Sequence, residues 1–183
     1  MKTDEPKVVG ESFPGACDLA APARRDVPLD AVVQLAAMIC GTPMSTVTVI
    51  EGAKQRHRAK VGVDAWETPK EHAFCVYTLK SPGMFVVPDA LLDERFRENP
   101  LVTGPPNIRF YAGVPIRTEL GEAIATLCVL DRVPRMLSGD QSGALEMLSR
   151  QVAARFESYG RMQQMARLQA ENDRMQRMLT GRG

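Results

Sequence analysis

Five side chains in two short segments of this sequence could bind or transform a small molecule. They are Cys75, Arg109, Tyr111, Thr126 and Cys128. A guanidinium group and two hydroxyls offer directed hydrogen bonds, and a thiol that loses its proton becomes a nucleophile. These residue types are those of a small binding pocket with a few polar groups, and we take them as the candidate ligand site.

Four of the five belong to residues 108–131, IRFYAGVPIRTELGEAIATLCVLD, which alternate as a β-hairpin. With TELG as the turn, Gly113 is predicted to face Thr126, and Tyr111 to face Cys128. One face of the hairpin is then apolar and small enough for closely packed helices. It carries Phe110, Ala112, Val114, Ile116, Ala123, Ala125, Leu127 and Val129. The opposite face carries the polar candidates, so we expect the pocket there.

A purely structural role is the alternative for each candidate. Tyr111 and Thr126 would then only bond loop backbone, and Arg109 would pair with Asp89 or Asp93, because buried polar groups are usually satisfied within the protein.

Cys75 has a similar alternative, since an unpaired cysteine is most often a small buried apolar residue. A reactive Cys75 would need a cation nearby, and His72 is predicted to share its side of a short helix. His57, between two arginines in RHR, is expected to be solvated.

The elements that position these residues mix helices with antiparallel strands. A helix is predicted where apolar residues recur at helical spacing before Gly41, and β-branched runs predict strands. Asp89 is expected to cap a helical turn, and Asp131 to fix the turn into the last helix. The predicted order is a helix at 28–40, a hairpin at 45–62, a short helix at 72–79, a strand at 84–88, a helical turn at 91–99, the hairpin at 108–131 and a long helix from 138.

Charge and composition argue against several classes of function. The 183 residues carry 23 basic and 22 acidic side chains, a net charge of +1 that would not attract nucleic acid or an anionic membrane. No apolar run reaches the roughly 18 residues of a membrane span, and the charged start lacks the centre of a signal peptide, so we expect a cytoplasmic protein. The four cysteines have no metal-site spacing, so we expect reduced thiols, with no metal and no cofactor.

Residues 85–141, FVVPDALLDERFRENPLVTGPPNIRFYAGVPIRTELGEAIATLCVLDRVPRMLSGDQ, resemble bacterial GAF domains of the type found in sensor histidine kinases and diguanylate cyclases. The likeness extends over roughly residues 27–158. It implies an α/β (α+β) fold in which a central antiparallel sheet has the N- and C-terminal helices on one face and a loop-covered pocket on the other. The chain would then divide into an N-terminal arm at 1–26, a GAF domain at 27–160 and a coiled-coil signalling helix at 161–183.

The resemblance also implies a function: a sensory or regulatory domain that binds an unknown small molecule and signals through its terminal helices. Its output kinase or cyclase domain would belong to another or a longer chain. The alternatives are a ligand-free dimerisation module and, more distantly, a cysteine-based redox sensor or an enzyme like free methionine sulfoxide reductase. Otherwise no catalysis is expected.

Two familiar GAF ligands fit the sequence poorly. Bilin-binding GAF domains place a histidine after their cysteine, where this chain has Val76. The cyclic-nucleotide signature places a phenylalanine upstream of an Asp-Glu pair, and here Asp89 occupies that position. The chain also departs from related GAF domains at Arg56 and His57, where an aromatic pair is common, and at Ala125, where glycine is usual.

The C-terminal helix predicts a homodimer. Beyond Gly160, apolar residues and one asparagine recur at coiled-coil spacing. These residues are Met165, Leu168, Asn172, Met175 and Leu179. An asparagine at an a position pairs best with its twin in a parallel, two-stranded coil. The alternative is a helix folded back on its own domain.

Overall fold

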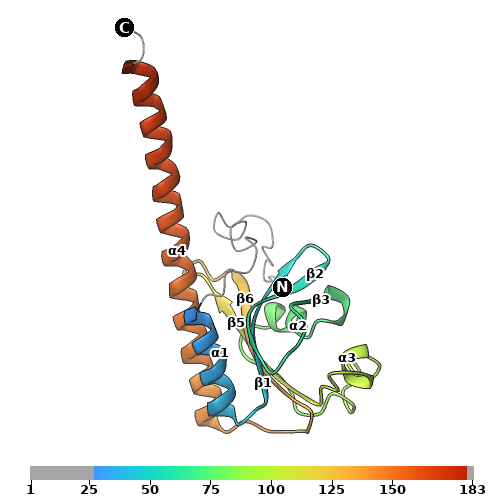
Figure 1. The fold of residues 1–183 in the computed structure, drawn as a ribbon. Coiled ribbons are helices and arrows are strands. Elements are labelled where there is room, and N and C mark those ends of the chain that lie inside the picture. Colours follow the sequence, from blue (N-terminus) through green and yellow to red (C-terminus); the bar gives the residue numbers. More distant parts are fainter. Residues whose placement is uncertain (1–26, 181–183) are drawn as a thin grey trace, which may run out of the picture.

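The computed structural model describes residues 27–180, and its centre is one six-stranded sheet (Figure 1). All paired strands are antiparallel, and their order is β3-β2-β1-β6-β5-β4. The strands are β1 (Met44–Glu51), β2 (Lys54–Val61), β3 (Glu67–Pro69), β4 (Phe85–Val87), β5 (Phe110–Arg117) and β6 (Ala123–Asp131). The predicted arm at 1–26 lies outside the described residues.

Two helices, α1 (Val27–Cys40) and α4 (Gly139–Thr180), lie side by side on one face of this sheet (Figure 1). α1 ends where Gly41 adopts a left-handed φ of 63°, a conformation that glycine accepts without strain. The apolar face of β5 and β6 packs against these helices, as we predicted from its small side chains. The core between them includes Val33, Leu127, Leu145, Val152 and Phe156.

The other face of the sheet is covered by short elements and loops. These are a 3-10 turn, η1 (Lys70–His72), two short helices, α2 (Cys75–Lys80) and α3 (Pro100–Thr103), and the connections between them. Stacked rings fix this layer: the Phe74 ring lies 4.1 Å from that of Phe96 and 5.1 Å from that of Tyr111. The GAF-type arrangement of terminal helices on one face and loops on the other is therefore confirmed.

The β5–β6 hairpin turns where predicted, but its register differs from the prediction by two residues. Gly113 faces Cys128 and Tyr111 faces Leu130. One residue of the difference arises at the turn, where Arg117 pairs with Ala123, and the other at a bulge between Ile116 and Arg117. A shift of two residues leaves each side chain on its predicted face, since the period of a strand is two.

Paired charges anchor the loops that cover the second face. Arg109 donates two hydrogen bonds, of 2.7 and 2.6 Å, to the carboxylate of Asp89, and this is the structural alternative considered for Arg109. Asp89 also accepts from the amide of Leu91, as predicted for a cap. Asp131 accepts from the amides of Arg132 and Val133, which confirms its role at the turn after β6.

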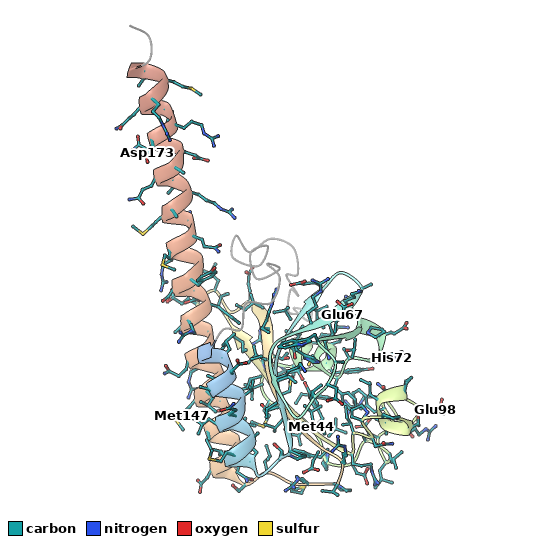
Figure 2. The ribbon with its side chains drawn as sticks, viewed as in Figure 1. Met44, Glu67, His72, Glu98, Met147 and Asp173 are labelled. Atoms are coloured by element: carbon teal, nitrogen blue, oxygen red, sulfur yellow. The ribbon has the colours of Figure 1, made fainter. Side chains whose placement is uncertain are left out.

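α4 continues without a break through Gly160 and leaves the domain (Figure 1). Its buried stripe ends at Phe156, and nearly all side chains from 161 to 179 are exposed; Asp173 marks this part in Figure 2. The helix therefore does not fold back onto its own domain. No helix within residues 27–180 combines the length and the hydropathy needed to cross a membrane.

Candidate ligand-binding site

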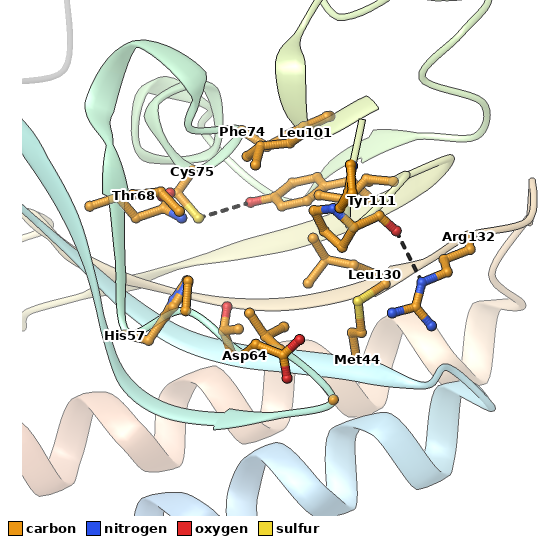
Figure 3. A pocket seen from close by; sticks show the side chains of 18 residues that line it. Met44, His57, Asp64, Thr68, Phe74, Cys75, Leu101, Tyr111, Leu130 and Arg132 are labelled. Carbon is orange, nitrogen blue, oxygen red and sulfur yellow. Dashed lines mark hydrogen bonds between the residues drawn. The ribbon is translucent and has the colours of Figure 1, made fainter. Parts of the chain in front are cut away.

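A cavity of about 340 Å³ opens between the sheet and its loop cover (Figure 3). Strands β1, β2 and β3 form one side, and α2, α3 and the loop around Pro106 form the other. Most of its lining is apolar. The apolar residues include Met44, Val63, Phe74, Leu101, Ile108 and Leu130. Its volume falls at the lower end of the range for small-molecule sites, and the cavity lies on the face predicted from the hairpin.

One side of the cavity is polar, and we call its residues Thr46, Gln55, His57 and Thr68 the polar wall. Gln55 and Thr68 are cross-strand partners on β2 and β3, so their side chains share a face. Gln55 Oε1 and Thr68 Oγ1 are both buried, and neither has a hydrogen-bond partner within the described chain. A buried polar atom without a partner costs about 1–3 kcal/mol, which a ligand that donates a hydrogen bond would recover.

His57 is the clearest correction to the sequence analysis, which expected it in solvent. The residue is only 8% exposed, because β1 and β3 flank β2 and the side chain points to the loop-covered face. Its Nδ1 lies 2.9 Å from Thr48 Oγ1, which in turn lies 2.9 Å from Thr46 Oγ1. Burial, with a smaller effect of Lys60, lowers the pKa of His57 to about 4. The ring is therefore neutral at pH 7.

Formal charges are confined to exposed residues of the cavity lining. Asp64 and Arg132 are the charged members, and Arg132 donates to the carbonyl of Pro106 at 3.0 Å (Figure 3). The buried part of the cavity has hydroxyl, amide, imidazole and thiol groups, but no carboxylate, ammonium or guanidinium group.

Beside the cavity lies a buried group of hydroxyls and thiols, the thiol cluster. It consists of Cys75, Thr78, Tyr111, Thr126 and Cys128. The Tyr111 hydroxyl lies 2.6 Å from Thr78 Oγ1 and 3.1 Å from Cys128 Sγ, and it donates to Cys75 Sγ at 3.5 Å. The two sulfur atoms are 3.4 Å apart.

The five candidate residues thus have different positions. Cys75 and Tyr111 line the cavity, whereas Thr126 and Cys128 are fully buried behind it and contact it only through the thiol cluster. Arg109 is paired with Asp89 and is not part of the lining. Binding of a ligand by these residues stays a prediction.

The predicted pairing of His72 with Cys75 is wrong. His72 ends η1, whereas Cys75 begins α2, so the two do not share a helix. The His72 side chain lies 3.6 Å from exposed Glu71 instead. Within residues 27–180, no group of three or more histidine, cysteine or acidic side chains could hold a metal ion.

Sequence reasoning missed the polar wall of β2, although a signal was present. Gln55, His57 and Ala59 alternate with Arg56 and Arg58, so the period of two already separates an uncharged face from a charged one. The dense positive charge in this strand hid that alternation.

Comparisons with known proteins agree with this architecture. The family model described as GAF domain matches residues 24–156. A cyclic di-GMP phosphodiesterase of Pseudomonas aeruginosa is 43% identical over 116 residues, which are 63% of this chain and 20% of that protein. This chain therefore matches only a fifth of the relative's length.

Two solved structures show the same fold at low sequence identity. The GAF domain of a phosphoenolpyruvate-protein phosphotransferase from Coxiella burnetii has a TM-score of 0.63 at 13% identity, covering 82% of this chain and 92% of that one. A type II free methionine-R-sulfoxide reductase from Thermoplasma acidophilum has a TM-score of 0.59 at 16% identity, covering 72% and 92%. At such identities the likeness concerns the fold alone.

Proposed function

The chain belongs to the GAF domain family, and on this premise we propose that it is a sensory domain that binds a small molecule in the cavity and signals through α4. One observation carries the proposal. The cavity is lined mainly by apolar side chains, yet it holds two buried polar atoms, Gln55 Oε1 and Thr68 Oγ1, without partners. An apolar pocket with a few directed polar groups is the usual form of a small-molecule site.

The lining also defines the ligand's chemistry. Gln55 Oε1 only accepts hydrogen bonds, so the ligand has at least one N–H or O–H donor. Its body is apolar, because Phe74, Leu101 and Ile108 offer no polar side-chain atoms. It is uncharged, because the buried lining has no carboxylate, ammonium or guanidinium group to pair with a charge, and burying an unpaired charge is strongly unfavourable.

The related phosphodiesterase is named for a cyclic dinucleotide, but we assign that chemistry to the output and not to this cavity. Cyclic di-GMP carries two phosphates and two purines. A cavity of about 340 Å³ whose charged lining residues are exposed suits a smaller, neutral molecule. The proposed output is a cyclic-nucleotide enzyme or a kinase, in another or a longer chain.

Signal transmission would use β1 and β6, because each contacts the cavity on one face of the sheet and the terminal helices on the other. β1 and β6 contribute Thr46 and Leu130 to the cavity, and their other faces pack under α1 and α4. A ligand that prefers one loop arrangement would shift the population of sheet and helix packings. The exposed part of α4 would carry that shift to a second copy through its coiled-coil positions.

The test uses a cavity-filling substitution with a matched control. Leu101 is partly buried and lines the cavity, so Leu101→Trp places an indole in it. Leu91→Trp adds the same group at a position that is 42% exposed and outside the lining. Fractions of a bacterial metabolite extract below about 1 kDa are screened for those that raise the melting temperature, since a ligand stabilises the folded state it binds.

We expect at least one fraction to stabilise the native chain and Leu91→Trp but not Leu101→Trp. Circular dichroism checks that both variants are folded. Stabilisation that persists in Leu101→Trp would place the ligand elsewhere. The absence of any active fraction would favour the ligand-free dimerisation module instead.

A further inference from the structure

The two thiols of the thiol cluster come from distant parts of the chain and meet inside it. Cys75 begins α2 in the loop cover, and Cys128 lies in β6 opposite Thr46 and Gly113. Their sulfur atoms are 3.4 Å apart, and both residues are buried. A disulfide bond is about 2.05 Å long, so a small displacement of α2 toward the sheet would bring the two sulfurs to bonding distance.

The two thiols are chemically unequal. Hydrogen bonding from Cys128, with smaller effects from the hydroxyls of Thr126, Tyr111 and Thr48, outweighs burial and lowers the pKa of Cys75 to about 7. Burial raises the pKa of Cys128 well above its usual value, and ionised Cys75 raises it further. Cys75 is therefore the first of the pair to become a thiolate, while Cys128 keeps its proton.

The two thiols also differ in access. Cys75 lines the cavity, whereas Cys128 is fully buried behind it. A reagent that enters the cavity meets the more acidic sulfur first and finds a second, protonated thiol next to it. The cavity volume limits such a reagent to a small molecule.

We propose that Cys75 and Cys128 form a dithiol site that reduces a small hydroperoxide entering the cavity and is itself converted to a disulfide. This activity goes beyond ligand sensing and does not require a retained ligand. It requires only a nucleophilic sulfur in contact with the cavity and a second thiol within reach of it.

The chemistry balances in two steps. The Cys75 thiolate attacks one peroxide oxygen, so an S–O bond forms and the O–O bond breaks, leaving a Cys75 sulfenic acid and an alkoxide or hydroxide that takes a proton from water. The Cys128 sulfur then attacks Cys75 Sγ, the S–S bond forms, and the sulfenic hydroxyl leaves with the Cys128 proton as water. The two sulfurs supply the two electrons that the peroxide accepts.

Cys40 provides an internal control. It lies on α1, in the core cluster between the terminal helices and the sheet, on the face opposite the cavity. Burial raises its pKa to about 11. Neither Cys75 nor Cys128 belongs to that cluster, so Cys40 should take no part in the reaction.

The experiment uses the full chain, reduced and freed of reductant. It is treated with stoichiometric hydrogen peroxide, quenched with N-ethylmaleimide and mapped by peptide mass spectrometry. We expect a Cys75–Cys128 disulfide that dithiothreitol reverses, formed about 10-fold or more faster than any modification of Cys40, as expected from their different thiolate populations. The rate should rise with pH around 7, where Cys75 ionises.

Variants separate the two roles. Cys128→Ser should stop at a Cys75 sulfenic acid, which dimedone traps, and Cys75→Ser should leave Cys128 reduced. Cys40→Ser should behave like the native chain. Oxidation of Cys75 no faster than that of Cys40, or a disulfide that joins other cysteines, would overturn the proposal, and the native-chain map gives this result even if a variant does not fold.

Discussion

The hydroxyl of Tyr111 on β5 lies 2.6 Å from Oγ1 of Thr78 on α2, and both groups lie directly above the backbone of Gly113. A Cβ atom at position 113 would come within 2.3 Å of the Tyr111 hydroxyl and 2.7 Å of Thr78 Oγ1. The absence of a side chain at this position therefore lets α2 close onto the sheet through a buried hydrogen bond.

Gly113→Ala should separate these two hydroxyls and loosen the cover of the cavity. We expect the free energy of unfolding to fall by about 1–3 kcal/mol, as for other additions to a well-packed interior. Gly83→Ala is the control, since a Cβ there meets nothing within 4 Å, and it should change stability by no more than about 0.5 kcal/mol. Urea denaturation measures both, and equal effects would contradict the close contact.

Tyr111→Phe should itself lower the free energy of unfolding by about 1–3 kcal/mol, because it leaves Thr78 and the two thiols without the hydroxyl they share. Combined with Gly113→Ala, however, its effect should be clearly less than additive. The missing hydroxyl removes part of the clash with the new methyl group. An additive double mutant would show that the hydroxyl does not limit residue 113.

The buried imidazole of His57 should make stability depend on pH in mildly acidic solution. Its pKa is lowered from 6.5 to about 4 by burial, so between these values the unfolded chain binds more protons than the folded one. Stability is then complete above about pH 6.5 and falls on acidification toward pH 4, by up to about 3 kcal/mol for this shift.

His57→Asn should lose this part of the pH dependence. The chain has 2 histidines, and the other, His72, lies outside the cavity lining. His72→Asn should therefore retain the pH dependence, because the buried His57 is unchanged in it. Denaturation midpoints of the three proteins, measured from pH 4 to 7, give the comparison. Parallel curves for all three would mean that His57 is accessible to water.

Gln55→Leu should stabilise the ligand-free protein and remove its ligand response. Replacing an unpartnered buried acceptor with an apolar group relieves a cost of about 1 kcal/mol or more. The same change deletes the atom that a ligand donor would meet. Gln151→Leu, at an exposed position on α4, should leave both properties unchanged. A destabilised Gln55→Leu that still responds to the active extract fraction would count against the polar wall.

The exposed part of α4 should dimerise the chain. Asn172→Leu should tighten self-association and admit higher oligomers, because an apolar seam tolerates other registers. Asp173→Leu introduces a leucine one residue off the seam and should have little effect. Deleting residues 161–183 should weaken the dimer. Light scattering at concentrations up to about 100 μM would detect any dimer with micromolar affinity, and a monomeric native chain would contradict the coiled coil.

Local sequence patterns determined the faces of the sheet. Alternation in residues 108–131 assigned each hairpin side chain to the helix face or the cavity face, and the assignment survived a register error of two residues. It survived because a shift of two returns every side chain to the same side, whereas a shift of one would have reversed them all. Helical spacing and β-branched runs likewise predicted most of the elements in their observed order.

Tertiary structure alone decided which of these residues meet. Whether the His57 side chain is solvent-exposed or buried depends on β3 and on the loop cover. The sequence of β2 alone does not specify either of them. The contact between Cys75 and Cys128, 53 residues apart, depends on how α2 is held above β6 by Tyr111 and Thr78. Periodicity acts over a few residues and fixes the direction of a side chain, whereas its partner is set by packing between segments far apart in the chain.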